Sequence, residues 1–261
     1  MTDYKKYYNR LYKQPYQTKR YAKWKGYNKH TKLASSLVAG TRILDIGCGE
    51  GIITRQLNGN LVYAIDISEN AIKYAKENNK KTRFTIGSAS QLPYVDKTFD
   101  CVSAFEVLEH LTAKDMHNCL KEIQRICKDH GRIVISTPNR SSIYYAAIRS
   151  MRIQNKEHIN EMDFIKTINV LSKYFTITSI HSHTGTTWFR TSYATEIISK
   201  LQDIFLKLFP PMKSLFYSQI YIVSINTKKN TITPNTKTHT QTNRQTQAST
   251  TKNKTTQPLK S

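Results

Sequence analysis

Cysteine is scarce in this sequence, and its spacing does not suggest a cross-linked or metal-bound framework. The 261 residues contain four cysteines, and none of them forms a C-x-x-C pair. No segment at the start of the sequence reads as a signal peptide. We therefore expect a cytoplasmic chain with reduced thiols, not a disulfide-stapled fold or a zinc knuckle. The four cysteines are Cys48, Cys101, Cys119 and Cys127.

Long apolar runs are also missing. The sequence has no stretch of about 18 uncharged apolar residues, the length that a membrane-spanning helix requires. The richest stretch, Ile204 to Ile225, is interrupted by Lys207, Lys213 and a pair of prolines. We expect no membrane span.

Acidic residues are few, and the resulting positive charge is concentrated at the two ends. The chain carries 40 Lys or Arg against 18 Asp or Glu, a net charge of +22. Residues 1–32 hold ten of the bases and one acid, and the residues from Asn226 onward hold seven bases and no acid. Such ends attract polyanions, so RNA and an anionic membrane surface are candidate partners, the latter implying a peripheral location. Simple solvation of the ends is the alternative.

Composition divides the chain into three parts. Residues 1–32 form a basic arm that we expect to be partly helical, residues 33–226 form the folded domain, and residues 227–261 form a Thr-, Asn- and Lys-rich tail that we expect to be disordered and dispensable for folding. Packing against the domain is the commonest use for tyrosines such as those of the arm, and stacking on bases or on a cofactor is the alternative. These tyrosines are Tyr4, Tyr7, Tyr8, Tyr12, Tyr16, Tyr21 and Tyr27.

Within the domain, β-branched runs alternate with turn residues and amphipathic stretches. This alternation is typical of an α/β fold with a doubly wound, mostly parallel sheet, here of seven strands. The ligand crevice of such a sheet lies at the carboxyl ends of the strands. The expected strands cover residues 42–46, 61–66, 83–87, 99–105, 132–137, 175–181 and 218–226, and the expected helices cover residues 51–57, 68–78, 114–128 and 163–172.

The first expected strand runs into a glycine-rich turn, Asp45-Ile46-Gly47-Cys48-Gly49-Glu50-Gly51. Three glycines at alternate positions allow a ligand to lie against the backbone amides of the turn. Asp66 ends the second strand, where a carboxylate can accept hydrogen bonds from both hydroxyls of a ribose. The G-x-G-x-G spacing departs from the G-x-G-x-x-G of dinucleotide sites and so argues against NAD.

This turn resembles motif I of the class I S-adenosylmethionine-dependent methyltransferases, most closely the ubiquinone-biosynthesis-type O-methyltransferases. Four further motifs of that family follow in the same order. The resemblance implies a Rossmann-like methyltransferase fold and methyl transfer from S-adenosylmethionine. The further motifs are the acid Asp66, the loop Leu92 to Asp100, the segment Glu106 to His110, and the turn Thr137 to Asn139.

The resemblance also implies a set of cofactor-binding residues. The family commonly places an acid after the third strand for the adenine amino group, whereas this sequence has Ser88 and Ala89 there. A serine oxygen accepts the same hydrogen bond without charge assistance. Phe105 either flanks the adenine or ends a core strand. The full set is Asp45, Gly47, Cys48, Gly49, Gly51, Asp66, Ile67, Ser88, Ala89 and Phe105.

Two carboxylates and an imidazole occur within five residues, at Glu106, Glu109 and His110. Oxygen and nitrogen ligands at this spacing could hold a divalent metal ion, with His158 as a fourth ligand, and such an ion lowers the pKa of a bound hydroxyl. Alternatively, His110 is a general base that acts without a metal. A purely structural role for the cluster is the third interpretation.

The acceptor of the methyl group is open at this stage. We expect O-methylation of a small hydroxylated acceptor, phenol- or quinone-like or lipid-associated, because the turn after the fifth strand and the apolar segment Ile143 to Ile148 resemble the quinone-type enzymes. The second candidate is 2′-O-methylation of a terminal RNA nucleotide, since enzymes of that type share the E-x-x-E-H segment. A non-catalytic basic binding module is the third candidate, and the intact glycine turn argues against it. The oligomeric state does not follow from the sequence.

Overall fold

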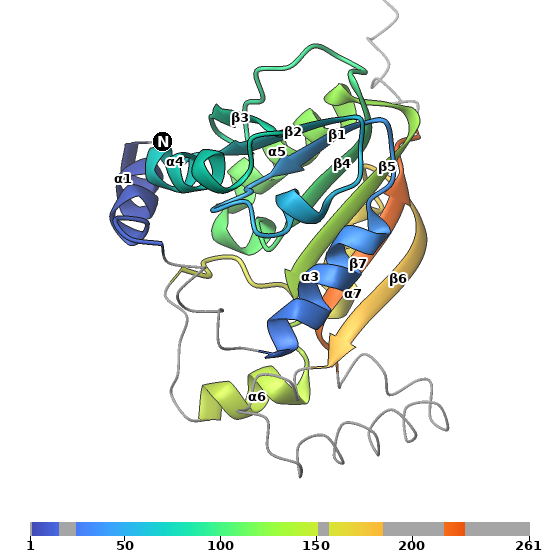
Figure 1. The fold of residues 1–261 in the computed structure, drawn as a ribbon. Coiled ribbons are helices and arrows are strands. Elements are labelled where there is room, and N and C mark those ends of the chain that lie inside the picture. The colour runs from blue at the N-terminus through green and yellow to red at the C-terminus, as the bar shows by residue number, and fades with distance from the viewer. Residues whose placement is uncertain (1, 16–24, 151–156, 185–216, 228–261) are drawn as a thin grey trace, which may run out of the picture. The chain divides into compact units, whose positions relative to one another are not determined.

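The computed structural model describes residues 2–15, 25–150, 157–184 and 217–227 of the chain (Figure 1). The expected tail at residues 227–261 lies almost wholly outside these residues, as does part of the arm. The helices are α1 (Thr2–Leu11), α3 (Lys25–Leu37), α4 (Glu69–Asn78), α5 (Ala113–Ile126), α6 (Ile143–Ser150) and α7 (Phe164–Leu171). The strands are β1 (Arg42–Ile46), β2 (Leu61–Asp66), β3 (Arg83–Ile86), β4 (Phe99–Phe105), β5 (Cys127–Pro138), β6 (Thr176–Thr184) and β7 (Tyr217–Ile225).

The seven strands form one sheet in the order β3-β2-β1-β4-β5-β7-β6. The first five are parallel to one another, and β7 runs antiparallel between β5 and β6. After β1 the chain builds outward through β2 and β3, and then crosses to the other side of β1 to form β4. The point of reversal between β1 and β4 is where ligands bind in open α/β sheets. The predicted doubly wound, mostly parallel sheet is confirmed.

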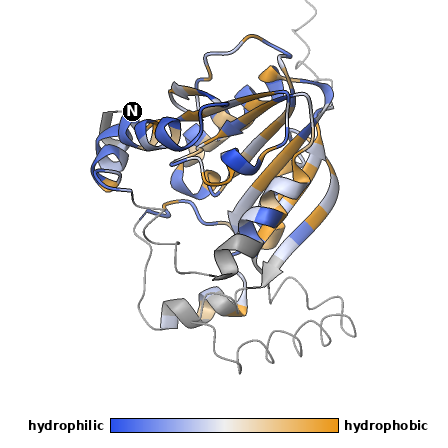
Figure 2. Ribbon diagram, viewed as in Figure 1, coloured by the Kyte–Doolittle hydropathy of each residue, from blue (hydrophilic) through white to orange (hydrophobic). Residues whose placement is uncertain are grey.

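Alternate residues along the strands face two separate layers of core. One face, which includes Leu44 and Val102, packs against α5 and α7. The opposite face, which includes Ile43 and Cys101, packs against α3. This alternation follows from the two-residue period of a strand, and it explains why apolar residues on the central strands face both sides of the sheet (Figure 2).

Helix α5 shows how the flanking helices are specified. Its buried residues recur at spacings of three and four, which places them on one face of the helix. Thr112 caps the helix, since its hydroxyl accepts a hydrogen bond from the Asp115 backbone N–H. The buried residues are Met116, Cys119, Leu120, Ile123 and Ile126.

Two expected elements differ from the structure. The helix expected over residues 51–57 is only a single 3₁₀ turn, Thr54–Gln56. The Gly51 backbone has a φ of +72°, outside the helical region, and the Thr54 hydroxyl bonds to Asp45 beneath the turn. Strand β5 begins at Cys127, five residues earlier than expected, because the chain leaves α5 directly into a pairing with Phe99 of β4.

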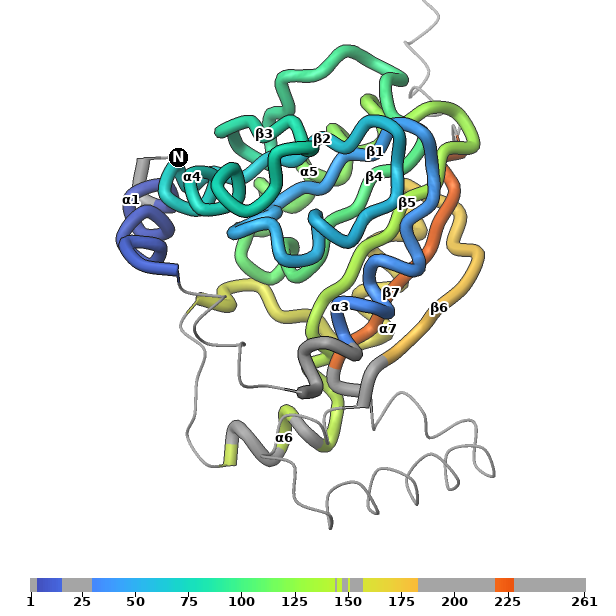
Figure 3. The backbone as a smooth tube through the Cα atoms, in the orientation of Figure 1, coloured from blue at the N-terminus to red at the C-terminus, as the bar shows by residue number. Residues whose placement is uncertain are grey.

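The amino-terminal helices are part of the same fold. Helix α3 continues across the boundary expected at Leu33, and its residues Ala34 and Leu37 are buried against the sheet. Helix α1 lies beside α4, as the backbone trace shows (Figure 3). All four cysteines are buried thiols, and burial raises the pKa of Cys101, Cys119 and Cys127 to about 12. Among the described helices, none has the length and apolar character needed to span a bilayer.

Candidate active site

The glycine turn after β1 requires glycine at three positions. Gly47, Gly49 and Gly51 have φ values of +67°, +53° and +72°, in the left-handed region that other residues rarely adopt. A Cβ atom at position 47 would lie 2.5 Å from Cγ2 of Val107, which follows β4. The turn after β1 and the segment after β4 therefore meet in direct contact, which brings two motifs that are distant in the sequence to the same crevice.

Asp66 connects this turn to the start of α4. Its carboxylate accepts a hydrogen bond of 2.8 Å from the Gly49 backbone N–H and one of 2.9 Å from the Ser68 backbone N–H. Ile67 separates Asp66 from Ser68 in the chain, and the Ser68 hydroxyl caps α4 by accepting a hydrogen bond from the Ala71 backbone N–H. Burial raises the pKa of Asp66, whereas these backbone donors lower it. Asp66, which the sequence predicts to bind the ribose, is thus held against the predicted glycine turn.

Asp45 is more deeply placed than Asp66. Its carboxylate is buried and accepts hydrogen bonds from the hydroxyls of Thr54, at 2.6 Å, and Ser103, at 2.9 Å. Burial raises the pKa of Asp45 to about 6, against the effect of these two hydrogen bonds. With its oxygens engaged in this way, Asp45 holds the glycine turn against β4. Cys48, within the turn, is buried, and burial raises its thiol pKa well above the ordinary value.

The three residues expected near the adenine have different surroundings. The Ser88 hydroxyl lies 2.9 Å from that of Ser90, just beyond the end of β3, and Ala89 packs against the core. Phe105 is 6% exposed and lies in the core layer beneath α3, with its ring 6.4 Å from that of Tyr221. Of the two alternatives for Phe105, the structure supports the core-strand interpretation.

Glu106 begins the turn after β4 in a strained conformation. Its φ of +55° is unusual for a residue with a side chain and costs about 1–3 kcal/mol, which the surrounding contacts must offset. Its carboxylate accepts hydrogen bonds from the Ser136 hydroxyl, at 2.7 Å, and from the Gln219 amide, at 3.0 Å. Glu106 therefore faces β5 and β7, and its oxygens are engaged there.

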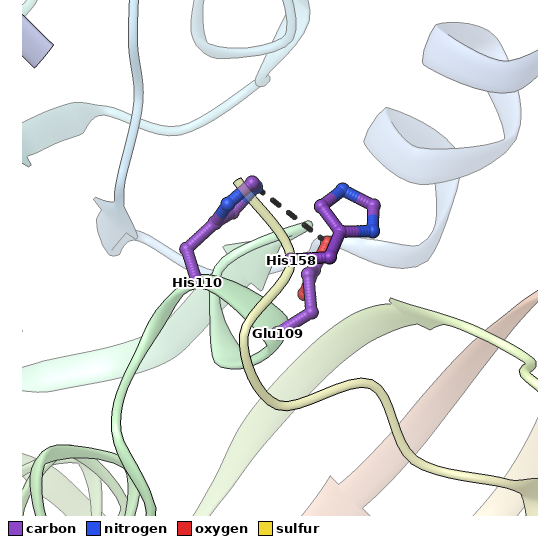
Figure 4. Close-up of side chains that lie close together, drawn as sticks. All are labelled: Glu109, His110 and His158. Atoms are coloured by element: carbon purple, nitrogen blue, oxygen red, sulfur yellow. Dashed lines mark ion pairs between the residues drawn. The ribbon is translucent and has the colours of Figure 1, made fainter. Parts of the chain in front are cut away.

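The structure brings together three of the four predicted metal ligands: Glu109, His110 and His158 (Figure 4). One potential ligand atom from each lies within 4.8 Å of the others, and the imidazole centroids are 4.9 Å apart. Glu109 is fully buried, and its Oε1 atom has no hydrogen-bond partner among the described residues. This orphaned oxygen lies 3.9 Å from Nε2 of His110. A buried carboxylate oxygen without a donor is costly unless a cation or a proton satisfies it.

Both imidazoles are oriented by partners on the side away from Glu109. Nδ1 of His110 lies 3.0 Å from the Glu157 carbonyl oxygen, and Nδ1 of His158 lies 2.7 Å from the Glu161 carboxylate. A proton on each Nδ1 satisfies these acceptors and leaves a lone pair on each Nε2. Imidazoles that bind metals are oriented in this way, so the donor set fits a divalent ion.

The protonation states within the cluster favour this interpretation over a lone base. Burial and the nearby Glu106 charge raise the pKa of Glu109 well above its ordinary value, and a bound cation would oppose this shift. Burial and the neighbouring His158 lower the pKa of His110 to about 4. An imidazole with so low a proton affinity is a poor general base at neutral pH.

The sequence predicts that the tyrosines of the arm pack on the domain or stack on a cofactor, but it does not single out any of them as a site residue. Tyr8 of α1 lies edge-on to His110 with its ring centroid 6.0 Å away, and Tyr12 is buried near the glycine turn. Their spacing of four residues, which Tyr4 extends, was the available signal. Gln219 and Glu161 carried no comparable signal, since only the fold brings them to Glu106 and His158.

Comparisons with known proteins agree with this geometry. Residues 44–135 match the family model described as a methyltransferase domain. The mitochondrial ubiquinone biosynthesis O-methyltransferase of Schizosaccharomyces pombe is 36% identical over 46% of this chain and 45% of its own length. The enzyme of the same name from Rickettsia akari is 34% identical over 46% of each chain. The chain thus spans just under half the length of these curated relatives.

Solved structures show the same fold at low sequence identity. An N-methyltransferase, NodS, from Bradyrhizobium japonicum, solved with S-adenosyl-L-homocysteine, matches with a TM-score of 0.61 at 15% identity, covering 86% of this chain and 98% of its own. A Haloferax volcanii complex of the Trm112 activator and a putative methyltransferase matches with a TM-score of 0.62 at 15% identity, covering 85% of this chain and 98% of that chain.

The lowered pKa of His110 predicts a pH dependence of stability. Between pH 4 and 6.5 the unfolded state binds more protons at this residue than the folded state, so its contribution to stability is full above pH 6.5 and is lost as pH falls toward 4. In His110→Asn, measured free of metal by urea unfolding, the loss of stability from pH 7 to 4.5 should be smaller than in the wild type by roughly 2 kcal/mol. Equal losses in the two proteins would contradict the assignment.

Proposed function

We propose that residues 44–135 form a class I S-adenosylmethionine-dependent methyltransferase domain and that the chain transfers the cofactor's methyl group to a hydroxyl group of a small acceptor. One observation carries this proposal. The glycine turn and Asp66 on one side, and the Glu109, His110 and His158 cluster on the other, meet at the switch point of the sheet. A cofactor site and an acceptor site must adjoin in this way for a group to pass between them.

The cofactor side follows from the chemistry of the residues. Asp66 offers carboxylate oxygens to the ribose hydroxyls, and the turn from Gly47 to Gly51 offers a side-chain-free backbone to the amino-acid end. Asp45 acts indirectly by fixing the turn through Thr54 and Ser103. Ser88 and Ala89 border the adenine side beyond β3. This assignment extends the family resemblance residue by residue.

On the acceptor side, Glu109, His110 and His158 would hold a divalent ion. Such an ion, when bound, lowers the pKa of an acceptor hydroxyl and orients the resulting oxygen toward the methyl group. The role of this chain's own residues is to fix the ligand atoms: the Glu157 carbonyl oxygen orients His110, and the Glu161 carboxylate orients His158. Since the sulfonium sulfur is already a good leaving group, alignment and removal of the acceptor's proton are the main tasks that remain.

A small, partly apolar acceptor is favoured by the surroundings of the cluster. The backbone N–H groups of Ile159 and Asn160 both donate to the Glu109 carbonyl oxygen at 3.0 Å, which fixes the segment that carries His158. Ile159 is 54% exposed beside the cluster, and Ile143 is 51% exposed at the start of α6. The names of the two curated relatives described above, ubiquinone biosynthesis O-methyltransferases, suggest a phenol- or quinone-like acceptor.

The acceptor class is tested by methyl transfer to separated cell fractions. We expect a methyl-labelled cofactor to label a product in the lipid and small-molecule fraction, and the label to be released only by treatments that cleave methyl ethers. Label found only in RNA, at a terminal ribose, would contradict this proposal and favour the RNA 2′-O-methyltransferase alternative.

The cofactor assignment predicts a specific loss of affinity. Asp66→Ala removes the charge-assisted acceptor of the ribose hydroxyls and should weaken S-adenosylmethionine binding by about 1.5–3 kcal/mol in calorimetry. Glu77→Ala, on the exposed face of the adjoining helix α4, is the matched control and should bind as the wild type does. Unchanged affinity in a folded Asp66→Ala protein would overturn the assignment.

The metal assignment is tested by direct binding as well as by rate. Glu109→Gln retains the shape of the side chain but loses its charge, so Mn²⁺ affinity measured by electron paramagnetic resonance should fall at least tenfold, while cofactor affinity stays within about threefold. EDTA should abolish methyl transfer by the wild type, and Mg²⁺ or Mn²⁺ should restore it. Full transfer in EDTA, or Mn²⁺ binding by Glu109→Gln as tight as by the wild type, would leave the cluster with a structural role.

A further inference from the structure

Helix α1 presents a row of tyrosines to the crevice. Tyr4 and Tyr8 are four residues apart on one face of α1, and Tyr12 directly follows the helix, with its backbone N–H bonded to the Tyr8 carbonyl oxygen at 2.9 Å. Tyr12 is 6% exposed and Tyr8 is half-buried, whereas Tyr7, on a neighbouring face, is 44% exposed. The fold alone does not require this arrangement, because the sheet is already covered by α3, α4, α5 and α7.

Contacts to the start of α4 fix α1 directly beside the predicted ribose site. The Asn9 side-chain oxygen accepts a hydrogen bond of 3.0 Å from the Ser68 hydroxyl, and its backbone oxygen accepts one of 2.8 Å from the Asn70 amide. Lys5 forms an ion pair with Glu69 at 2.5 Å. Ser68 also donates its backbone N–H to Asp66, so a single residue links α1 to the ribose acid.

Tyr8 is the member of the row that faces both halves of the site. Its ring lies edge-on to His110, with 6.0 Å between centroids. The carboxylates of Glu157, Glu109 and Asp66 all act on its hydroxyl electrostatically. Asp66 belongs to the cofactor side, and Glu109 and His110 belong to the acceptor side. Tyr8 therefore lies near residues of both sides of the site.

We propose that Tyr8 is a cofactor-binding residue that contacts the sulfonium group of S-adenosylmethionine and positions its methyl toward the acceptor. The inference rests on the proposed function and goes beyond it, because it adds a residue from outside the methyltransferase domain to the reacting centre. The electron-rich face of a tyrosine ring attracts a cation, and most strongly where water is excluded. Tyr12, which follows the same helix, is buried near Glu50 and Cys48 of the glycine turn.

This role has a consequence that distinguishes it from simple coverage of the pocket. S-adenosylmethionine carries a positive charge on sulfur, and the product S-adenosylhomocysteine has a neutral thioether at the same position. A residue that acts through the charge stabilises the first complex and not the second. Tyr8 thus favours the reactive cofactor over the spent one, whereas a residue that merely excludes water would affect both alike.

The test is calorimetric affinity for both compounds, measured on the full chain. Tyr8→Leu should weaken S-adenosylmethionine binding about tenfold and S-adenosylhomocysteine binding less than threefold. Tyr8→Phe, which keeps the ring, should bind both within about threefold of the wild type. Lys6→Ala, at an exposed position of the same helix, is the control and should leave both affinities unchanged. If Tyr8→Leu does not fold, Tyr8→Met serves in its place with the same expected ratio.

Three outcomes would overturn the inference. Equal losses for the two compounds in Tyr8→Leu would give Tyr8 a covering role only, and unchanged affinity would remove it from the site. The proposed function is tested separately by the wild type. A wild-type chain that binds neither compound would overturn the proposed function and this inference together. A wild type that binds both compounds, with an unchanged ratio of the two affinities in Tyr8→Leu, would overturn this inference alone.

Discussion

Acidic side chains gather at the carboxyl edge of the sheet without a lysine or arginine partner among the described residues. Asp45 and Glu109 are fully buried there, and Asp66 and Glu106 are partly exposed. Burial raises the pKa of all four, since removing a carboxylate from water disfavours its charged form. Hydroxyl and backbone donors offset part of this cost, but one oxygen of Glu109 has no donor. In a chain with a net charge of +22, this edge stands out as acidic, which is the basis for the proposal that it binds cations from outside the chain.

Both ligands that the proposal requires are cations. S-adenosylmethionine carries a sulfonium and an ammonium group, and the predicted acceptor-side ion is divalent. Each cation would interact with a carboxylate that otherwise binds a proton or lacks a hydrogen-bond donor. Water screens such charges only weakly in these surroundings. The same reasoning explains why a tyrosine ring, and not a basic residue, lies between the two halves of the site. A lysine at position 8 would repel the sulfonium group, whereas an aromatic ring attracts it.

The fold positions this edge through two turns with left-handed backbone, of which only the second is strained. The left-handed glycines after β1 allow close contact with Val107, and the left-handed Glu106 after β4 turns the chain so that Glu109 and His110 point back into the crevice. Glu106 is held in this conformation by Ser136 and Gln219, on strands that follow much later in the sequence. Strain of this kind is maintained where the surroundings over-determine it, as they do here.

The sequence was informative wherever a local pattern decides the structure. The strands β1, β2 and β4 occur at the predicted residues because runs of β-branched and apolar residues end at clear turn signals. The glycine turn was predicted because only glycine tolerates its backbone. Other features depend on contacts between distant segments. The direction of the Glu106 side chain follows from Gln219, more than a hundred residues away, and the ring of Phe105 packs on Tyr221. The role of α1 depends on contacts to α4 that no pattern within residues 1–32 shows.

The central claim is that one crevice holds the cationic cofactor and the divalent ion side by side beneath α1. A crystal structure of the full chain with S-adenosyl-L-homocysteine and Mn²⁺, with data collected at the manganese absorption edge, tests this claim most directly. The account predicts ribose hydroxyls on Asp66, the thioether sulfur beside Tyr8, and an anomalous peak bound by Glu109, His110 and His158. A cofactor bound away from Asp66, or an empty histidine cluster in crystals saturated with Mn²⁺, would contradict it.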